Sequence, residues 1–201
     1  DPMSNRYAPI SSLVLLSLFA LQTHAQLIPI PDPGLRSLYN SWVPGCVDAN
    51  GDLDASLPAV QAYAGPAYIE LANPTITGLD AFISLTHLDM IGINTVDAFP
   101  PNLEYLSIFS CLNTALPPLP NTLTSLRLSG LIYVTDVTVP EGCDTLFLDH
   151  MSALTSIGTL PSSLRSLFLN ATAITTLPVL PEGLEELILS YSAPGFNTSF
   201  T

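Results

Sequence analysis

The chain has 201 residues, of which 48% are hydrophobic and 10% are charged, so it can bury a hydrophobic core and is too apolar to be intrinsically disordered. Its 17 acidic and 4 basic residues give a net charge of −13, which argues against nucleic acid or an anionic membrane surface as a partner. Its 19 prolines are spaced along the chain rather than clustered, which indicates a repeated structure.

The first 25 residues have the pattern of a secretory signal peptide. Arg6 precedes an apolar run over residues 13–21, and Thr23 and Ala25 place small residues before a predicted cleavage after Ala25. A transmembrane helix needs about 20 apolar residues, so this run is too short to be one. Residues 1–2, before Met3, are interpreted as read-through or a cloning scar. We therefore expect a secreted or cell-surface protein whose mature chain does not insert into a membrane.

Residues 26–64 are predicted to form an N-terminal cap. Asp32 is suited to cap a helix that has Pro33 at its first position. The apolar residues that follow have helical spacing and would form one buried face: Leu35, Leu38, Tyr39 and Trp42.

A loop within this cap alternates acidic and amide side chains: Asp48, Asn50, Asp52 and Asp54. Oxygen ligands in this alternation can bind calcium. The EF-hand pattern also requires glycine at its sixth position and glutamate at its twelfth, where this chain has Leu53 and Ala59. A turn rich in Asp, Asn and Gly explains the same residues. Calcium is thus the alternative to a simple turn, and no cofactor is expected.

The three cysteines, Cys46, Cys111 and Cys143, do not form a disulfide framework. Their number is odd and no C-x-x-C motif is present, whereas small secreted folds held by disulfides use even numbers at higher density. We expect all three to be small buried residues and no metal site to be built on them.

From residue 66 onward, the motif L-x-x-L-x-L recurs with conservative variants. Seven copies start at residues 66, 85, 103, 123, 143, 164 and 184. The alternating part of each copy predicts a short strand with its leucines facing inward, and the prolines disfavour a helix on the return path. A single copy cannot bury its leucines, so the copies must stack. We predict a β-rich solenoid with seven parallel strands on a concave face, extended or polyproline segments on the convex side, and a small helical N-terminal cap.

These repeats resemble the leucine-rich repeat family, in particular its shortest, helix-free class. Residues 174–189 read ITTLPVLPEGLEELIL and are similar to repeats of secreted effectors of enteric bacterial pathogens. Residues 30–35 and 76–82 read IPDPGL and ITGLDAF and resemble secreted Bacteroidetes and internalin-like surface proteins. The resemblance implies a bacterial binding protein that uses its concave face.

One position departs from the family pattern. Family repeats usually place asparagine eight residues after the first leucine, where its amide binds the turn backbone. In this chain those positions hold Pro74, Ile93, Cys111, Leu131, Met151, Thr172 and Ser192. We expect apolar packing to replace the asparagine ladder.

The outward positions of the predicted strands define candidate ligand-binding residues. Two or four places after the repeat starts lie Tyr68, His87, Tyr105, Arg127, Phe147, Phe168 and Ile188. Outward apolar and aromatic residues indicate a contact site, with a protein ligand expected and a glycan as the alternative. A covering domain or cap would explain the same patch. Glu70 and Asp89 are predicted to share one outward column, as a solvated acidic face.

No catalytic function is expected. The chain lacks the G-x-S-x-G and P-loop motifs, and His87 and His150 fall at different repeat offsets. Two alternatives to a binding protein remain. The repeats could be the substrate-recognition region of a larger secreted effector enzyme, because in the enteric effectors similar repeats precede a ubiquitin-ligase domain. The other alternative is a structural stalk. Residues 191–201 contain no cap helix pattern, which predicts a truncated or minimal C-terminal end.

Overall fold

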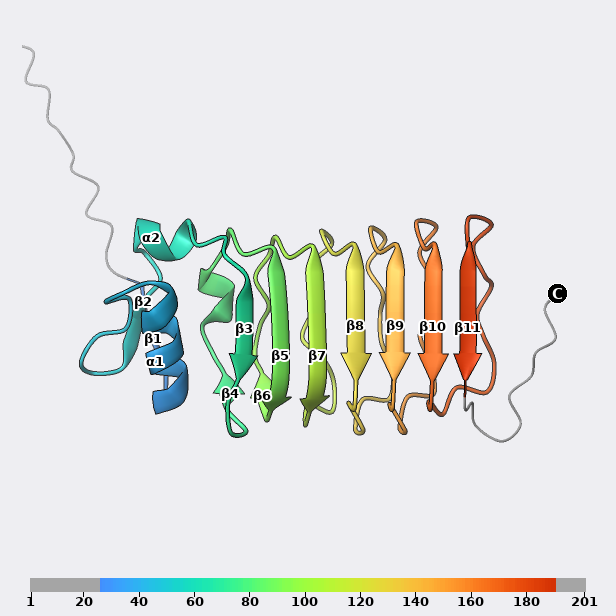
Figure 1. Ribbon diagram of the computed structural model, residues 1–201, viewed down its shortest axis with the longest axis horizontal. Helices are drawn as coiled ribbons and strands as arrows, with labels where there is room; N and C mark the ends of the chain where they lie inside the picture. The colour runs from blue at the N-terminus through green and yellow to red at the C-terminus, as the bar shows by residue number, and fades with distance from the viewer. Residues whose placement is uncertain (1–25, 191–201) are drawn as a thin grey trace, which may run out of the picture.

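The computed structural model describes residues 26–190 (Figure 1). The predicted signal peptide and the predicted C-terminal end at residues 191–201 lie outside the described residues. Within the described part of the chain, no helix has the length and apolar character needed to cross a membrane.

Seven parallel strands form one sheet in chain order. They are β3 (Ala67–Glu70), β5 (His87–Ile93), β7 (Tyr105–Cys111), β8 (Ser125–Ser129), β9 (Thr145–Asp149), β10 (Ser166–Asn170) and β11 (Glu186–Ser190). Figure 1 shows them as a row of arrows pointing the same way, with each return segment passing along one side of the sheet. The predicted parallel-strand solenoid is confirmed.

The leucines of successive repeats occupy the same register. One column contains Leu88, Leu106, Leu126, Leu146, Leu167 and Leu187. All of them except Leu187 are buried, and Leu187 on the last strand is half-buried. The pairing of these six strands matches the repeat starts predicted from residue 85 onward.

The predicted frame of the first repeat is wrong by two residues. Ala67 pairs with Leu88 and Ile69 pairs with Met90, so this repeat has the phase of a start at residue 64 rather than 66. Ala67 and Ile69 face the core, whereas Leu71, which the predicted frame placed inward, lies beyond the end of β3. The small Ala67 occupies a leucine position, which hid the correct phase.

The N-terminal end of the solenoid is covered by the predicted cap helix. Helix α1 (Pro33–Trp42) begins after Asp32, whose carboxylate accepts a hydrogen bond from the Leu35 amide at 2.8 Å. Leu35 and Tyr39 are fully buried. The antiparallel pair β1 (Leu27–Pro29) and β2 (Asp52–Asp54) and the short helix α2 (Pro58–Gln61) complete this end.

The return segments contain little regular structure. A short pair, β4 (Thr75–Ile76) with β6 (Thr95–Val96), and the 3-10 turn η1 (Leu79–Ala81) occur in the early repeats. Between residues 83 and 190 there is no helix. Four strands follow a turn in which a proline carbonyl accepts a hydrogen bond from the amide three residues later, at Pro120, Pro140, Pro161 and Pro181. This turn explains why proline recurs at repeat spacing.

Apolar side chains fill the place of the asparagine ladder. Ile93, Cys111, Leu131 and Met151 are no more than 1% exposed, and Thr172 is also buried. The three cysteines are free and buried, as expected. Burial raises the pKa of the Cys143 thiol to about 11, so it behaves as a small core residue.

Candidate functional site

The outward side chains of the seven strands form what we call the open face of the sheet. The register places them in three columns. The central column contains Tyr68, Asp89, Ser107, Arg127, Phe147, Phe168 and Ile188. A second column begins with His87 and Tyr105, and a third contains Glu70, Ile91, Phe109, Ser129, Asp149, Asn170 and Ser190.

Three of the predicted residues form one continuous stack in the central column, and a fourth follows them in register. The Phe147 and Phe168 rings are parallel within 5°, with centroids 4.2 Å apart. On the other side of Phe147, the Arg127 guanidinium carbon lies 4.6 Å from the ring centroid. Ile188 continues the column and is 39% exposed. Because parallel strands lie about 4.8 Å apart, side chains at equal register stack directly on one another.

His87 and Tyr105 form a separate aromatic pair in the second column. Their rings are nearly parallel, with centroids 5.8 Å apart. The Thr86 hydroxyl oxygen lies 3.0 Å from Nδ1 of His87. The structure therefore brings these two predicted residues together.

Tyr68 does not belong to that pair, which corrects its predicted position. Because the first repeat is shifted in phase, Tyr68 lies opposite Asp89 in the central column. Its hydroxyl donates a hydrogen bond to the Glu70 carboxylate at 2.8 Å, which raises the pKa of Tyr68. Glu70 in turn lies opposite Ile91, so the predicted pairing of Glu70 with Asp89 is also wrong.

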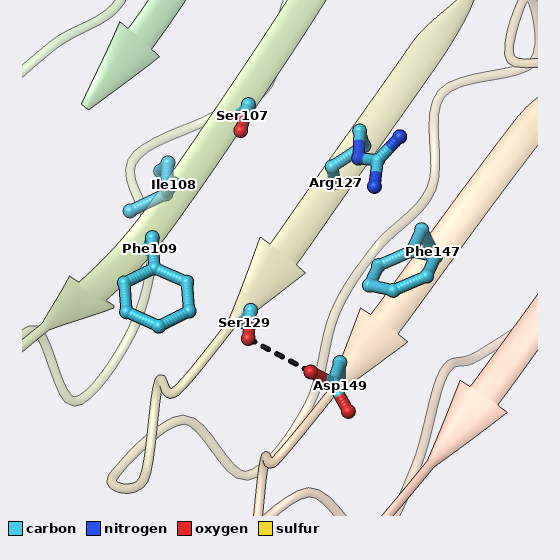
Figure 2. Close-up of a pocket in the computed structure, with 7 residues that line it drawn as sticks. All are labelled: Ser107, Ile108, Phe109, Arg127, Ser129, Phe147 and Asp149. Carbon is cyan, nitrogen blue, oxygen red and sulfur yellow. Dashed lines mark hydrogen bonds between the residues drawn. The ribbon is translucent and has the colours of Figure 1, made fainter. Parts of the chain in front are cut away.

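Between Phe109 and Phe147 the open face has a hollow of about 260 Å³ (Figure 2). Its lining residues are Ser107, Ile108, Phe109, Arg127, Ser129, Phe147 and Asp149. Phe109 is 54% exposed. The small side chains of Ser107 and Ser129 leave the hollow open between the larger aromatic ones. Sequence reasoning missed Phe109, Ser129 and Asp149 because only two outward positions of each repeat were considered.

Asp149 is the centre of a hydrogen-bond network at one end of this hollow. Its carboxylate accepts hydrogen bonds from Ser129 Oγ at 3.1 Å and Asn170 Nδ2 at 2.6 Å, and the Nδ1 atom of His150 lies 2.7 Å away. Partial burial acts to raise the pKa of Asp149, but the combined effect of His150, Asn170 and Ser129 lowers it below the ordinary carboxyl value. Asp149 is thus an ionised carboxylate held in place by its neighbours.

Arg127 is the positive end of the same hollow. Within residues 26–190, its guanidinium forms no ion pair with an acidic side chain. Figure 2 shows Arg127 and Asp149 at opposite ends of the hollow. The cation is therefore oriented by an aromatic ring rather than neutralised by a carboxylate.

The predicted calcium loop has the hydrogen bonds of a turn. Asp48 Oδ1 accepts hydrogen bonds from the amides of Asn50 and Asp52, at 2.8 and 3.0 Å. Asp54 Oδ1 accepts from the Ser56 amide at 3.0 Å. The hydrogen bond from the Asp52 backbone is the main cause that lowers the pKa of Asp48. Among the described residues, no three His, Cys, Asp or Glu side chains are grouped to hold a metal ion, and calcium is not needed to explain this loop.

Neither the known family models nor the curated proteins include a match to this chain. Its function is therefore inferred from the geometry and chemistry of the open face.

Proposed function

We propose that this chain is a secreted or surface-displayed leucine-rich repeat protein of bacterial origin that binds a protein ligand through the open face of its sheet. The observation that carries the proposal is the outward stack of Arg127, Phe147 and Phe168 beside Ile188. Aromatic residues and arginine are the side chains most enriched at the energetic centres of protein interfaces.

The assignment to leucine-rich repeats is supported by spacing and register. From residue 85 onward, the L-x-x-L-x-L motif recurs every 18 to 21 residues, and its leucines align strand by strand. Return segments without helices fit the shortest class of such repeats. The signal-peptide pattern of residues 1–25 supports secretion.

The arrangement of the rings favours a protein over a glycan as ligand. Arg127 covers one face of Phe147 and Phe168 covers the other. Both faces of the Phe147 ring, on which a sugar would stack, are therefore occupied, and its outward edge remains. A row of ring edges beside Ile188 suits apolar side chains of a protein partner.

The test compares variants of the open face with a variant of the return side. Proteins captured from an extracellular extract by the immobilised chain are purified, and their Kd is measured with each variant. The double substitution Phe147→Ser and Phe168→Ser should raise the Kd for the ligand by about 100-fold or more, as expected when two central contacts are lost. Val179→Ser, which changes a 91% exposed residue on a return segment, should leave the Kd within about twofold.

The thermal stability of the double variant provides the control for folding. Both rings lie on the outward side of the sheet, so the melting temperature should change little. Unchanged ligand affinity in the double variant would contradict the proposed binding face. A collapse of the fold would show that these rings are structural.

A further inference from the structure

We propose that the hollow between Phe109 and Phe147 binds a carboxylate group carried on an apolar ring or chain, and that Arg127 receives the carboxylate. The inference rests on the proposed function and deepens it, because it names the chemistry of the ligand group that the open face takes. It is carried by three features of the hollow: an available cation, an apolar wall and a carboxylate that other residues hydrogen-bond.

The available cation is Arg127. Its guanidinium is planar and always charged, and it can give a carboxylate two parallel hydrogen bonds. Stacking on Phe147 at 4.6 Å holds the group in one orientation, so less side-chain freedom is lost when a ligand binds. In the part of the chain that the structure describes, no acidic side chain lies within ion-pairing distance of it.

The other charged group of the hollow, Asp149, does not compete for Arg127. Ser129, His150 and Asn170 already surround its two oxygens. These contacts hold the carboxylate at the far end of the hollow from the guanidinium (Figure 2). The end of the hollow formed by Arg127 therefore favours an anion.

The apolar wall is Phe109, whose ring is 54% exposed. A ligand that places its carboxylate on Arg127 can lay an apolar body against this ring, with Ser107 and Ser129 leaving room between the two aromatic side chains. A volume of about 260 Å³ accommodates one such group. Because the chain carries a net charge of −13, a polyanion would be repelled, whereas a single carboxylate meets the local cation.

The first experiment measures binding of small probes to the purified chain by NMR titration. The probes are 3-phenylpropionate, its neutral amide 3-phenylpropanamide, and glucuronate, which carries a carboxylate on a polar ring. We expect 3-phenylpropionate to shift the Arg127 Nε–H signal and to bind about tenfold more tightly than either other probe. Equal binding of the amide would overturn the role of the carboxylate, and equal binding of glucuronate would overturn the role of the apolar wall.

Matched arginine variants locate the site. Arg127→Met should weaken the binding of 3-phenylpropionate about tenfold, so that it binds no more tightly than the amide. Arg165→Met is the control, because the Arg165 side chain donates to the Gly183 carbonyl at 2.8 Å and does not line the hollow. Phe109→Ser should weaken the carboxylate probe while the melting temperature stays unchanged. Binding that is equal in Arg127→Met and Arg165→Met would overturn the proposal.

The same variants separate this inference from the proposed function. If Phe147→Ser and Phe168→Ser abolish capture of a protein ligand but 3-phenylpropionate does not bind, the open face is a binding surface and the carboxylate site is wrong. If 3-phenylpropionate binds through Arg127 but the double variant captures its protein ligand normally, the carboxylate site in the hollow is supported and the proposed protein interface is wrong.

Discussion

At the end of three open-face strands, a residue other than glycine adopts a backbone conformation that normally belongs to glycine. Ser110 in the last part of β7 has a φ value of 63°, and His150 and Ala171, immediately after β9 and β10, have φ values of 48° and 49°. The equivalent residues in two other repeats are Gly92 and Gly130, also at positive φ. A Cβ atom in this region is strained. The neighbouring repeats therefore impose this backbone conformation on the turn even where the residue is not glycine and its Cβ atom disfavours it.

Replacement of Ala171 by glycine should relieve this strain. We expect Ala171→Gly to raise the free energy of unfolding by about 1 kcal/mol, the typical cost of a left-handed alanine less the entropy of an added glycine. Ala173→Gly, two residues later and outside the positive-φ positions, should lower it by about 0.5–1 kcal/mol. Urea unfolding measures both, and equal effects of the two substitutions would contradict the strain.

The hydrogen-bonded carboxylate of Asp149 predicts a pH dependence. Its folded-state pKa is lowered, so its contribution to stability is present above the ordinary carboxyl pKa of about 4 and is lost as the pH falls through the folded value. The difference in unfolding free energy between the native chain and Asp149→Asn should therefore have its full value at pH 6 and should shrink below about pH 4. Urea titrations at both pH values measure it, and a pH-independent difference would refute the network.

At the scale of the strand, identical leucines have unequal surroundings. Leu126 on β8 is fully buried between repeats on both sides, whereas Leu187 on β11 is half-buried because, among residues 26–190, only β10 pairs with its strand. The repeat motif predicts the same inward position for both residues. It does not predict the difference in burial, which depends on how many neighbours each repeat has in the stack.

Truncation of these two leucines should have different costs. Leu126→Ala should lower the free energy of unfolding by about 3 kcal/mol, because it leaves a cavity in a close-packed core. Leu187→Ala should cost about half as much, since its side chain is already partly exposed. Denaturant unfolding of the two variants makes the comparison, and equal losses would show that the end of the stack is as tightly packed as its centre.

At the scale of the whole molecule, the repeat spacing determined most of the fold. Apolar columns at steps of 18 to 21 residues permit only one register in which every strand buries its leucines, and Asp32 with Pro33 marked the cap helix. The first repeat escaped prediction because Ala67 stands where later repeats have leucine. The hollow was not predicted from the sequence because Phe109, Arg127 and Asp149 come from three different repeats and lie close together only when the strands are aligned.

Site-specific photo-crosslinking tests the central claim, that the open face contacts the protein ligand, most directly. A photoreactive phenylalanine analogue is placed at Phe168 in one sample and at Val179 in another, and each is irradiated with the captured ligand. Phe168 lies in the outward stack and Val179 on a return segment. We predict a covalent adduct with the ligand from position 168 and none from position 179. An adduct from position 179 alone would contradict the account and would place the ligand on the opposite side of the sheet.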